Sequence, residues 1–313
     1  MKWSSFLLSL AVIAIGCAPE TGVLIESDEG PVAPDLAPPI TRIAFGSCAF
    51  QWVEQPIFRA VVAAEPDLYL SLGDAIYGDF DGENTFDVTP ESLREEWQEL
   101  ADNPDWQHLT ANVPVMAVWD NHDYGKADKG PPMLAEREEG AGGSLGKYAP
   151  QTDPGVSLLG AAQWTWLEDQ LRHPAEVRLI ASSGQIVPDQ KGMDEWGIYP
   201  HERQRLFDVV ESTGAEGVVL LTGNVHFSEL SKTDEGSYPL YGFTSSGLTH
   251  VNEEYPQAPN DYRVAGPYVD LNFGLVEIDW EAPSPRITLQ IIDVEGNVQL
   301  EHELHLKELR DQG

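Results

Sequence analysis

The stretch "DLYLSLGDAIYGD", residues 67–79, joins a short apolar segment to a polar turn. Residues 67–74 predict a strand, and the shortness of its apolar run indicates that the strand is buried. A carboxylate and a phenol, Asp74 and Tyr77, follow the apolar run directly. The two polar side chains therefore follow the end of a predicted strand, which places them at the edge of a sheet. The same arrangement of an apolar strand followed by polar residues recurs along the chain.

Strands and helices alternate from residue 41 to residue 223. Strands are predicted over 42–47, 67–74, 113–120, 177–184 and 217–223, and helices over 55–66, 89–102, 161–173 and 201–213. Thr89 as N-cap and Pro90 in the first turn mark a helix start. The Gly- and Pro-rich residues 125–160 predict a long surface insertion. The rest of the chain is mostly strand, with a hairpin at Glu295-Gly296, so we expect one α/β domain with at least one mixed sheet.

Polar clusters follow five of these strands, at 46–48, 73–79, 119–125, 182–185 and 222–226. In open α/β sheets ligands bind beyond the carboxyl ends of the strands, so the clusters are expected to converge. No segment matches the P-loop pattern G-x-x-x-x-G-K-[ST], which excludes a P-loop nucleotide triphosphatase. The G-x-S-x-G pattern at residues 142–146 lies in the predicted insertion and not between a strand and a helix, so it is not a nucleophile elbow, and Ser47 has no obvious base nearby in the sequence. The mixture of Asp, Asn, His, Cys and Tyr favours a metal site.

Asp74 and Tyr77 can face one cation if the turn after the strand curls back. A phenol has a pKa of about 10, so Tyr77 would bind as phenolate only to a strongly acidic metal such as Fe(III). In the plainer interpretation Asp74 caps the following turn and Tyr77 packs in the core.

The other two clusters offer amide oxygens and imidazoles. Asn121 can supply a neutral oxygen to a hard metal, while the adjacent His122 points the other way and can donate a proton. An Asx-type turn with a surface histidine is the plainer alternative. Asn224 and His226 are two residues apart, and on an extended segment their side chains would point to the same side and reach one metal.

The N-terminus "MKWSSFLLSLAVIAIGCAPE" has the layout of an export signal. Lys2 forms a short basic region, and the apolar residues 6–16 are too few to span a bilayer stably. The segment ends in "AIGC", which resembles a bacterial lipoprotein box with Ala14 in place of the usual leucine. We therefore expect a lipoprotein signal peptide over residues 1–17, with lipid on Cys17 and the protein anchored to the bacterial membrane, facing the periplasm or the exterior. Plain secretion is the alternative.

A Pro-rich acidic linker is predicted over residues 18–40, before a domain that covers 41–313. The chain has two cysteines, and lipid on Cys17 would leave Cys48 without an intramolecular disulfide partner.

The charge balance is strongly acidic, with 52 Asp and Glu against 18 Lys and Arg and a net charge of −34. Such a surface repels phosphate backbones and anionic lipids, so nucleic-acid binding through a basic face is not expected. Contact with a membrane is expected only through the N-terminal lipid. Most of the acids are interpreted as a solvated surface.

"GDAIYGD", "NHD" and "GNVH", in this order, resemble the strand-end motifs of the calcineurin-like metallophosphoesterases. "FGSC" replaces their usual opening D-x-H, and together with the tyrosine of "GDAIY" it resembles the alkaline phosphatase D (PhoD-like) family. Further matches spread the resemblance over roughly residues 41–282: "LLGAAQWTWLEDQL", "EWGIYPHERQRL", "LTGNVHFSEL", "FTSSGLTH" and "NFGLVEIDW". The resemblance implies an α/β metallophosphoesterase-like four-layer fold, with two packed mixed β-sheets flanked by helices.

The resemblance also implies Fe(III) and one or two Ca(II) ions. The implied metal ligands are Cys48, Asp74, Tyr77, Asn121, Asn224 and His226. Of these, Cys48, Asp74 and Tyr77 would hold the iron, with Asp74 bridging toward calcium. The family often has Asp at positions 121 and 224, so each asparagine removes one negative charge and can change which divalent metal is held.

The implied activity is hydrolysis of a small phosphate ester, with a metal-activated hydroxide attacking phosphorus in line and His122 protonating the leaving group. Preference for a monoester or a diester stays open, and so do two alternatives. One is a phosphodiesterase or phospholipase, and the other is a non-catalytic metal-binding surface lipoprotein.

Overall fold

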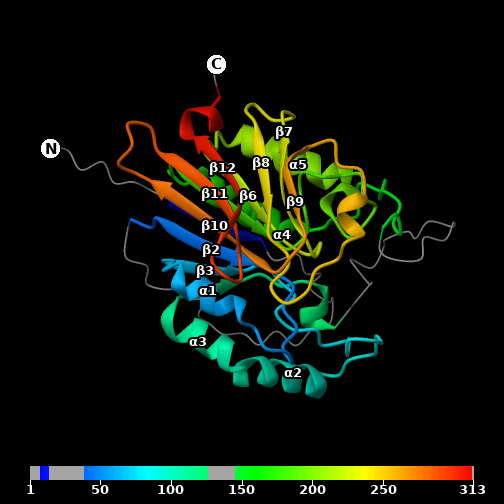
Figure 1. The fold of residues 1–313 in the computed structure, drawn as a ribbon. Helices are drawn as coiled ribbons and strands as arrows, with labels where there is room; N and C mark the ends of the chain where they lie inside the picture. Colours follow the sequence, from blue (N-terminus) through cyan, green and yellow to red (C-terminus); the bar gives the residue numbers. More distant parts are fainter. Residues whose placement is uncertain (1–7, 14–38, 126–144, 312–313) are drawn as a thin grey trace.

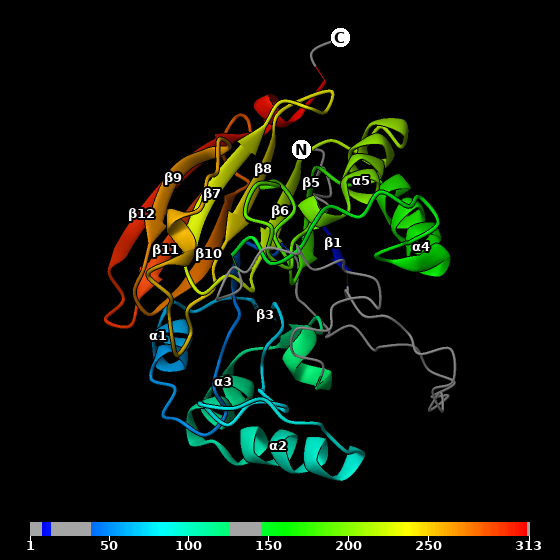
Figure 2. The same ribbon diagram turned by 90° about the vertical axis from the view of Figure 1, so that its right-hand side faces the viewer.

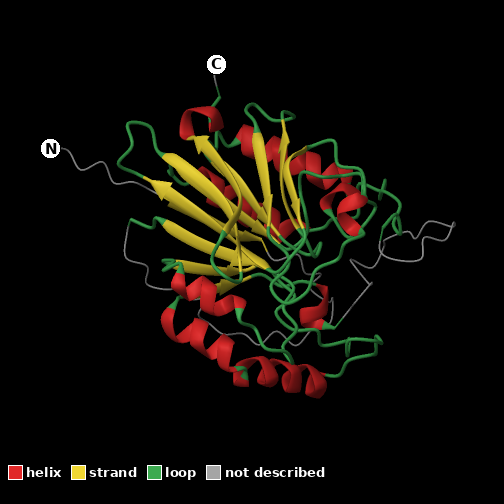
Figure 3. Ribbon diagram, in the orientation of Figure 1, coloured by secondary structure: helices red, strands yellow, loops and turns green. Residues whose placement is uncertain are grey.

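The computed structural model describes residues 8–13, 39–125 and 145–311, and two six-stranded mixed sheets form its centre (Figures 1 and 3). Sheet A has the order β1-β5-β6-β8-β7-β9, and sheet B has the order β12-β11-β10-β2-β3-β4. Sheet A consists of β1 (Leu8–Ile13), β5 (Val177–Ser182), β6 (Val218–Thr222), β7 (Ser228–Thr233), β8 (Leu240–Thr244) and β9 (Arg263–Tyr268). Sheet B consists of β2 (Arg42–Gly46), β3 (Leu68–Ser71), β4 (Val115–Ala117), β10 (Asn272–Asp279), β11 (Arg286–Asp293) and β12 (Val298–His305).

Helices cover the outer faces of both sheets, which confirms the expected architecture (Figures 1 and 2). The helices are α1 (Ile57–Ala63), α2 (Pro90–Asp102), α3 (Pro104–Asn112), α4 (Gly160–Arg172) and α5 (Pro200–Ser212). The inner faces of the two sheets meet where the rings of Phe45 and Phe243 contact edge to face, with centroids 5.3 Å apart. On the outer face of sheet B, Tyr69 of β3 contacts Phe58 of α1. Trp164 and the apolar face of α4 are buried with sheet A.

The strands that carry the polar clusters run parallel within each sheet. β2, β3 and β4 are neighbours in sheet B, and β5, β6 and β8 are neighbours in sheet A. Their carboxyl ends therefore lie at one edge of each sheet. The antiparallel hairpin β11–β12, which turns at Gly296 with a φ of 85°, confirms the predicted hairpin.

Two glycines allow the strand ends to approach one another closely. A Cβ on Gly73, which follows β3 and has a φ of 91°, would lie 2.5 Å from the Cβ of Asp120. A Cβ on Gly223, which follows β6, would lie 2.3 Å from the Oγ of Ser47. Both contacts are far shorter than real Cβ atoms tolerate, so only glycine lets these loops pack together. The loops after β2, β3, β4 and β6 are thereby brought to one place.

Helix starts explain one success and one omission of the sequence analysis. Thr89 caps α2, its side chain accepting a hydrogen bond from the backbone N–H of Ser92 in a reciprocal capping box. Helix α3 was not predicted, although Asn103 caps it and Pro104 occupies its first turn. Asn-Pro is the same kind of start signal as Thr-Pro, so α3 was detectable from the sequence.

Strand β1 consists of residues that the sequence analysis assigns to the apolar part of an export signal. It pairs in parallel with β5 at the edge of sheet A. The expected signal peptide therefore stays a prediction, and removal of residues 1–16 would leave β5 as the edge strand. Cys17 and most of the expected linker lie outside the described residues. Among the described helices, none is both long and apolar enough to cross a membrane.

Candidate metal centre

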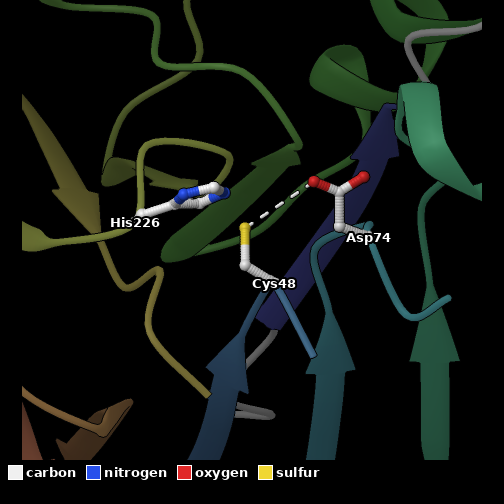
Figure 4. A group of neighbouring side chains, drawn as sticks. All are labelled: Cys48, Asp74 and His226. Carbon is white, nitrogen blue, oxygen red and sulfur yellow. Dashed lines mark hydrogen bonds between the residues drawn. The ribbon is translucent and has the colours of Figure 1, made fainter. Parts of the chain in front are cut away.

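The loops after β2, β3 and β6 bring a thiol, a carboxylate and an imidazole together. One ligand atom from each of Cys48, Asp74 and His226 lies within 4.8 Å of the others. Figure 4 shows the three side chains pointing toward one another from separate strand ends, with a hydrogen bond of 3.7 Å from Cys48 Sγ to Asp74 Oδ2. Cys48 and Asp74 are fully buried, and His226 keeps partial contact with solvent. Sulfur, oxygen and nitrogen donors at this spacing can hold a transition metal.

Unusual backbone conformations turn these side chains inward. Five non-glycine residues of the described chain have a positive φ, and four of them are Cys48 (67°), Asp74 (49°), Asn224 (67°) and His226 (57°). Left-handed backbone is uncommon for such residues and costs of order 1–3 kcal/mol where the residue is poorly suited to it. Its concentration at predicted ligands marks this edge of the sheets as a functional site.

Tyr77 joins the cluster through two histidines. Its hydroxyl lies 3.0 Å from Nε2 of His250 and 3.4 Å from Nε2 of His226. The ring of His250 stacks on Phe50, with centroids 3.9 Å apart and planes 9° from parallel. The backbone N–H of Tyr77 donates to the side-chain oxygen of Gln51 at 2.9 Å, which helps to hold the turn after β3. The hydroxyl of Tyr77 therefore contacts His226, one of the three clustered residues.

Burial and mutual repulsion act on every acidic group of this cluster. Removal from water raises the pKa of Cys48, and the neighbouring Asp74 carboxylate raises it further. Burial, followed by repulsion from Asp120, raises the pKa of Asp74, and burial with Cys48 nearby raises that of Tyr77. Burial lowers the pKa of His226 to about 4, so it stays neutral and able to ligate. A bound cation would offset this repulsion and favour the ionised forms of the thiol, the carboxyl and the phenol. The cluster therefore has the character of a metal site.

His122 lies beside the cluster in the 3₁₀ helix η1 (Asn121–Tyr124). Its Nδ1 is 2.6 Å from Oδ1 of the buried Asp79, and its ring centroid is 4.2 Å from that of Tyr77. Its side chain is 18% exposed, so the ring is reachable from solvent. A carboxylate on Nδ1 orients the imidazole and leaves Nε2 free to donate a proton.

Asp123 holds the turn that carries Asp74. Its two carboxylate oxygens accept the backbone N–H groups of Asp74 and Ala75, each at 2.8 Å, and of Ile76 at 3.2 Å. The N–H of Asp120 donates to the same side chain at 2.8 Å. Burial raises the pKa of Asp123 to about 6, and the backbone hydrogen bonds oppose that rise. One side chain thus joins the loops after β3 and β4.

Asp123→Ala is expected to lower the free energy of unfolding by about 3–5 kcal/mol, because four backbone donors lose a buried acceptor at once. Urea unfolding followed by circular dichroism measures the effect. Asp81→Ala is the matched control, since Asp81 accepts two backbone N–H groups in an exposed turn where water can replace it. Equal destabilisation by the two substitutions would contradict the role given to Asp123.

The backbone at Asn224 and His226 differs from the extended segment that the sequence analysis expected. The segment that carries Asn224 and His226 is a bend with left-handed residues at both positions, so the argument from an extended backbone was wrong. The Nδ2 of Asn224 donates to the backbone oxygen of Asp194 at 3.2 Å. Asn121 follows β4, and its Oδ1 is buried without a hydrogen-bond partner among the described residues.

Five residues of the site were not singled out from the sequence: Asp79, Asp120, Asp123, Asp194 and His250. Asp79, Asp120 and Asp123 lie within "GDAIYGD" and "WDNHDYG", so considering every carboxylate of these two motifs would have found them. His250 follows β8, another parallel strand, and the rule of strand ends would have found it. Asp194 lies well beyond β5, and no sequence signal placed it here.

The chain is similar to known proteins in both sequence and fold. The family described as PhoD-like phosphatase matches residues 133–258. Among solved structures, the structure of PhoD is similar, with a TM-score of 0.63 and 16% identity over 87% of this chain and 71% of that chain. GAP50, the anchor in the inner membrane complex of Plasmodium, is similar with a TM-score of 0.49 and 11% identity over 85% of this chain and 89% of that chain. The search of curated proteins found no match.

Proposed function

We propose that this chain, which matches the PhoD-like phosphatases over residues 133–258 and is similar in fold to PhoD, hydrolyses a small phosphate ester at the cluster of Cys48, Asp74 and His226. The observation that carries the proposal is the convergence of these side chains from three separate strand ends, with left-handed backbone at each. Tyr77 completes a donor set that suits a strongly acidic metal ion.

The residues fit the metals that the resemblance implies. Thiolate and phenolate donors favour Fe(III), so Cys48, Asp74 and Tyr77, with His226 beside them, would hold iron. The side-chain oxygens of Asn121 and Asn224 suit Ca(II) or another hard divalent ion, with Asp74 shared between the two metals. Bound metals would neutralise phosphoryl oxygens and lower the pKa of water from about 16 to about 7, which supplies a nucleophile near neutral pH.

His122 is proposed as the general acid. The Asp79 carboxylate, 2.6 Å from Nδ1, fixes the orientation of the ring. The other ring nitrogen then gives its proton to the leaving-group oxygen as the bond to phosphorus breaks. Such help is worth about 10²–10⁴-fold when the leaving group is a poor one.

The proposed function is tested by elemental analysis of the purified protein, together with a panel of paired phosphate monoesters and diesters assayed with calcium added and removed. Bound iron and calcium-dependent hydrolysis are expected. A metal-free protein with full activity would contradict the metal mechanism. A preference for diesters would select the phosphodiesterase or phospholipase form of the same activity.

Export and lipid anchoring are part of the proposal. The support is the basic Lys2, the apolar residues 6–16 and the "AIGC" ending at Cys17. Processing before Cys17 would remove β1, and it would place the acidic domain outside the cytoplasm on a tether of about 20 residues. No nucleic-acid partner is proposed for so acidic a chain.

Cys17→Ala is expected to abolish incorporation of labelled palmitate and to move the protein from the membrane fraction to the soluble one. The physical reason is that the lipid is the only membrane contact proposed for the chain. Cys48→Ser is the matched control, because it removes the other cysteine and should leave labelling intact. Labelling that persists in Cys17→Ala would contradict the anchor.

A further inference from the structure

Aromatic rings are stacked beside the candidate metal centre, on the loop that follows β2. The ring of Phe50 stacks on that of Trp52, with centroids 4.7 Å apart and planes 18° from parallel. It also stacks on the ring of His250, with centroids 3.9 Å apart. The ring of Tyr77 meets Phe50 edge to face at 4.6 Å. Because Phe50 and Trp52 are both partly exposed, this aromatic surface extends from the metal-binding cluster to solvent.

Phe80 extends the aromatic surface toward His122. Its ring centroid lies 6.3 Å from that of Phe50 and 6.4 Å from that of His122, and its side chain is partly exposed. Gly82, in the same loop, borders the indole of Trp52, since a Cβ on Gly82 would lie 3.9 Å from Cζ2 of that ring. The aromatic wall is the name given below to Phe50, Trp52 and Phe80.

His122 determines which part of a substrate would lie at the aromatic wall. As the proposed general acid it gives its proton to the leaving-group oxygen, so the leaving group must lie beside the imidazole. The phosphoryl group itself would lie at the cluster of Cys48, Asp74 and His226. Phe80 is the ring of the wall that neighbours His122, so a leaving group that extends away from phosphorus would meet the wall.

The charged groups in the loop that follows Phe80 are negative. Asp81 and Glu83 are both exposed, and the carboxylate of Asp81 accepts the backbone N–H of Glu83 at 2.9 Å. Like charges repel, so a leaving group that carries a further negative charge would be disfavoured here. An uncharged flat ring meets no such repulsion, and aromatic side chains favour flat rings in stacked or edge-to-face contact.

We propose that the aromatic wall binds the leaving group, and that the preferred substrates are phosphate esters whose leaving group carries an uncharged, flat aromatic ring. Trp52 and Phe80 are the specificity-determining residues, because both are partly exposed and neither holds a metal or transfers a proton. The inference rests on the proposed function, since it requires hydrolysis at the neighbouring cluster with His122 facing the leaving group.

Benzyl phosphate and cyclohexylmethyl phosphate provide the test, because both release a primary alcohol of similar size and only the benzyl ring is flat. The wild type is expected to have a kcat/KM about 2–10-fold higher for benzyl phosphate. In Trp52→Leu and in Phe80→Leu this ratio should fall toward 1, while kcat/KM for methyl phosphate, which has no ring, stays unchanged. Phe86→Leu is the matched control, since Phe86 is 42% exposed in the same loop and should leave the ratio unchanged.

Binding of the two matching phosphonates, which lack the ester bond, separates this inference from the proposed function. Calorimetric titration of the protein as purified should show the same preference for the benzyl ring, and its loss in Trp52→Leu and Phe80→Leu. A protein that hydrolyses no ester and keeps this preference would overturn the proposed function and leave the aromatic wall standing. Equal affinity or no binding for both phosphonates overturns the inference, as does an unchanged preference in folded Trp52→Leu and Phe80→Leu.

Discussion

His122→Ala is expected to lower the turnover of alkyl phosphates by about 10²–10⁴-fold and to leave that of nitrophenyl phosphate nearly unchanged. An alkoxide needs a proton as the bond to phosphorus breaks, whereas nitrophenolate leaves as a stable anion. The imidazole is placed for this role by its contact with Asp79 and by its position beside Tyr77. Steady-state kinetics on the two substrates, with metal content matched to the wild type, measures the effect.

Two variants separate the proton-donor role of His122 from a general disturbance of the site. Asp79→Asn retains a side chain of the same shape but removes the carboxylate, so a smaller loss with the same dependence on leaving group is expected. His108→Ala alters an exposed histidine on α3 and should change neither substrate. Equal losses on both substrates after His122→Ala would remove His122 from the acid role.

Cys48→Ser is expected to have the second largest effect, lowering iron affinity by at least about 100-fold and abolishing phosphatase activity. The thiol is fully buried, and its sulfur lies within 4.8 Å of ligand atoms of Asp74 and His226. A serine hydroxyl in the same place is far harder to ionise than a thiol, so it cannot replace the thiolate. Absorption spectroscopy and elemental analysis measure the loss.

Tyr77→Phe provides the companion measurement. Thiolate and phenolate on Fe(III) each give a visible charge-transfer band, so in excess Fe(III), which fills the site despite the lower affinity, Cys48→Ser should remove one band and Tyr77→Phe the other. Both variants leave Asp74 and His226 in place. A colourless wild-type protein that is fully loaded with metal and active would contradict the assignment of Cys48 and Tyr77 to iron.

Much of the fold was predictable because its signals are local. The run of apolar residues predicted β2, β3, β5 and β6, and the capping residues predicted the start of α2. The β11–β12 hairpin was visible at Glu295-Gly296, where a glycine takes a left-handed conformation. Helix α3 has the same start signal as α2, a capping residue followed by proline. It was missed because α3 begins within two residues of the end of α2.

For the candidate site, the sequence predicted which residue types follow which strands. Parallel strands deliver their following residues to one edge, so the grouping of Cys48, Asp74 and His226 followed from the order of the elements. The reason given for pairing Asn224 with His226 was wrong, because both residues have a positive φ that an extended segment lacks. A left-handed φ at a non-glycine residue has only a weak sequence signature, an enrichment of Asn, Asp and His, because the surrounding contacts impose it.

The sequence by itself determined which chemical groups follow each strand, because the order of the strands along the chain and the residues after them depend only on local sequence. Only the tertiary structure decided which groups share a centre. The direction of each side chain depends on contacts between loops far apart in the chain, such as Gly73 against Asp120 and Gly223 against Ser47. Those close approaches direct Cys48, Asp74 and His226 into one cluster. They also bring Asp120 to a small pocket that Asp194 lines as well, although no local pattern connects the two residues.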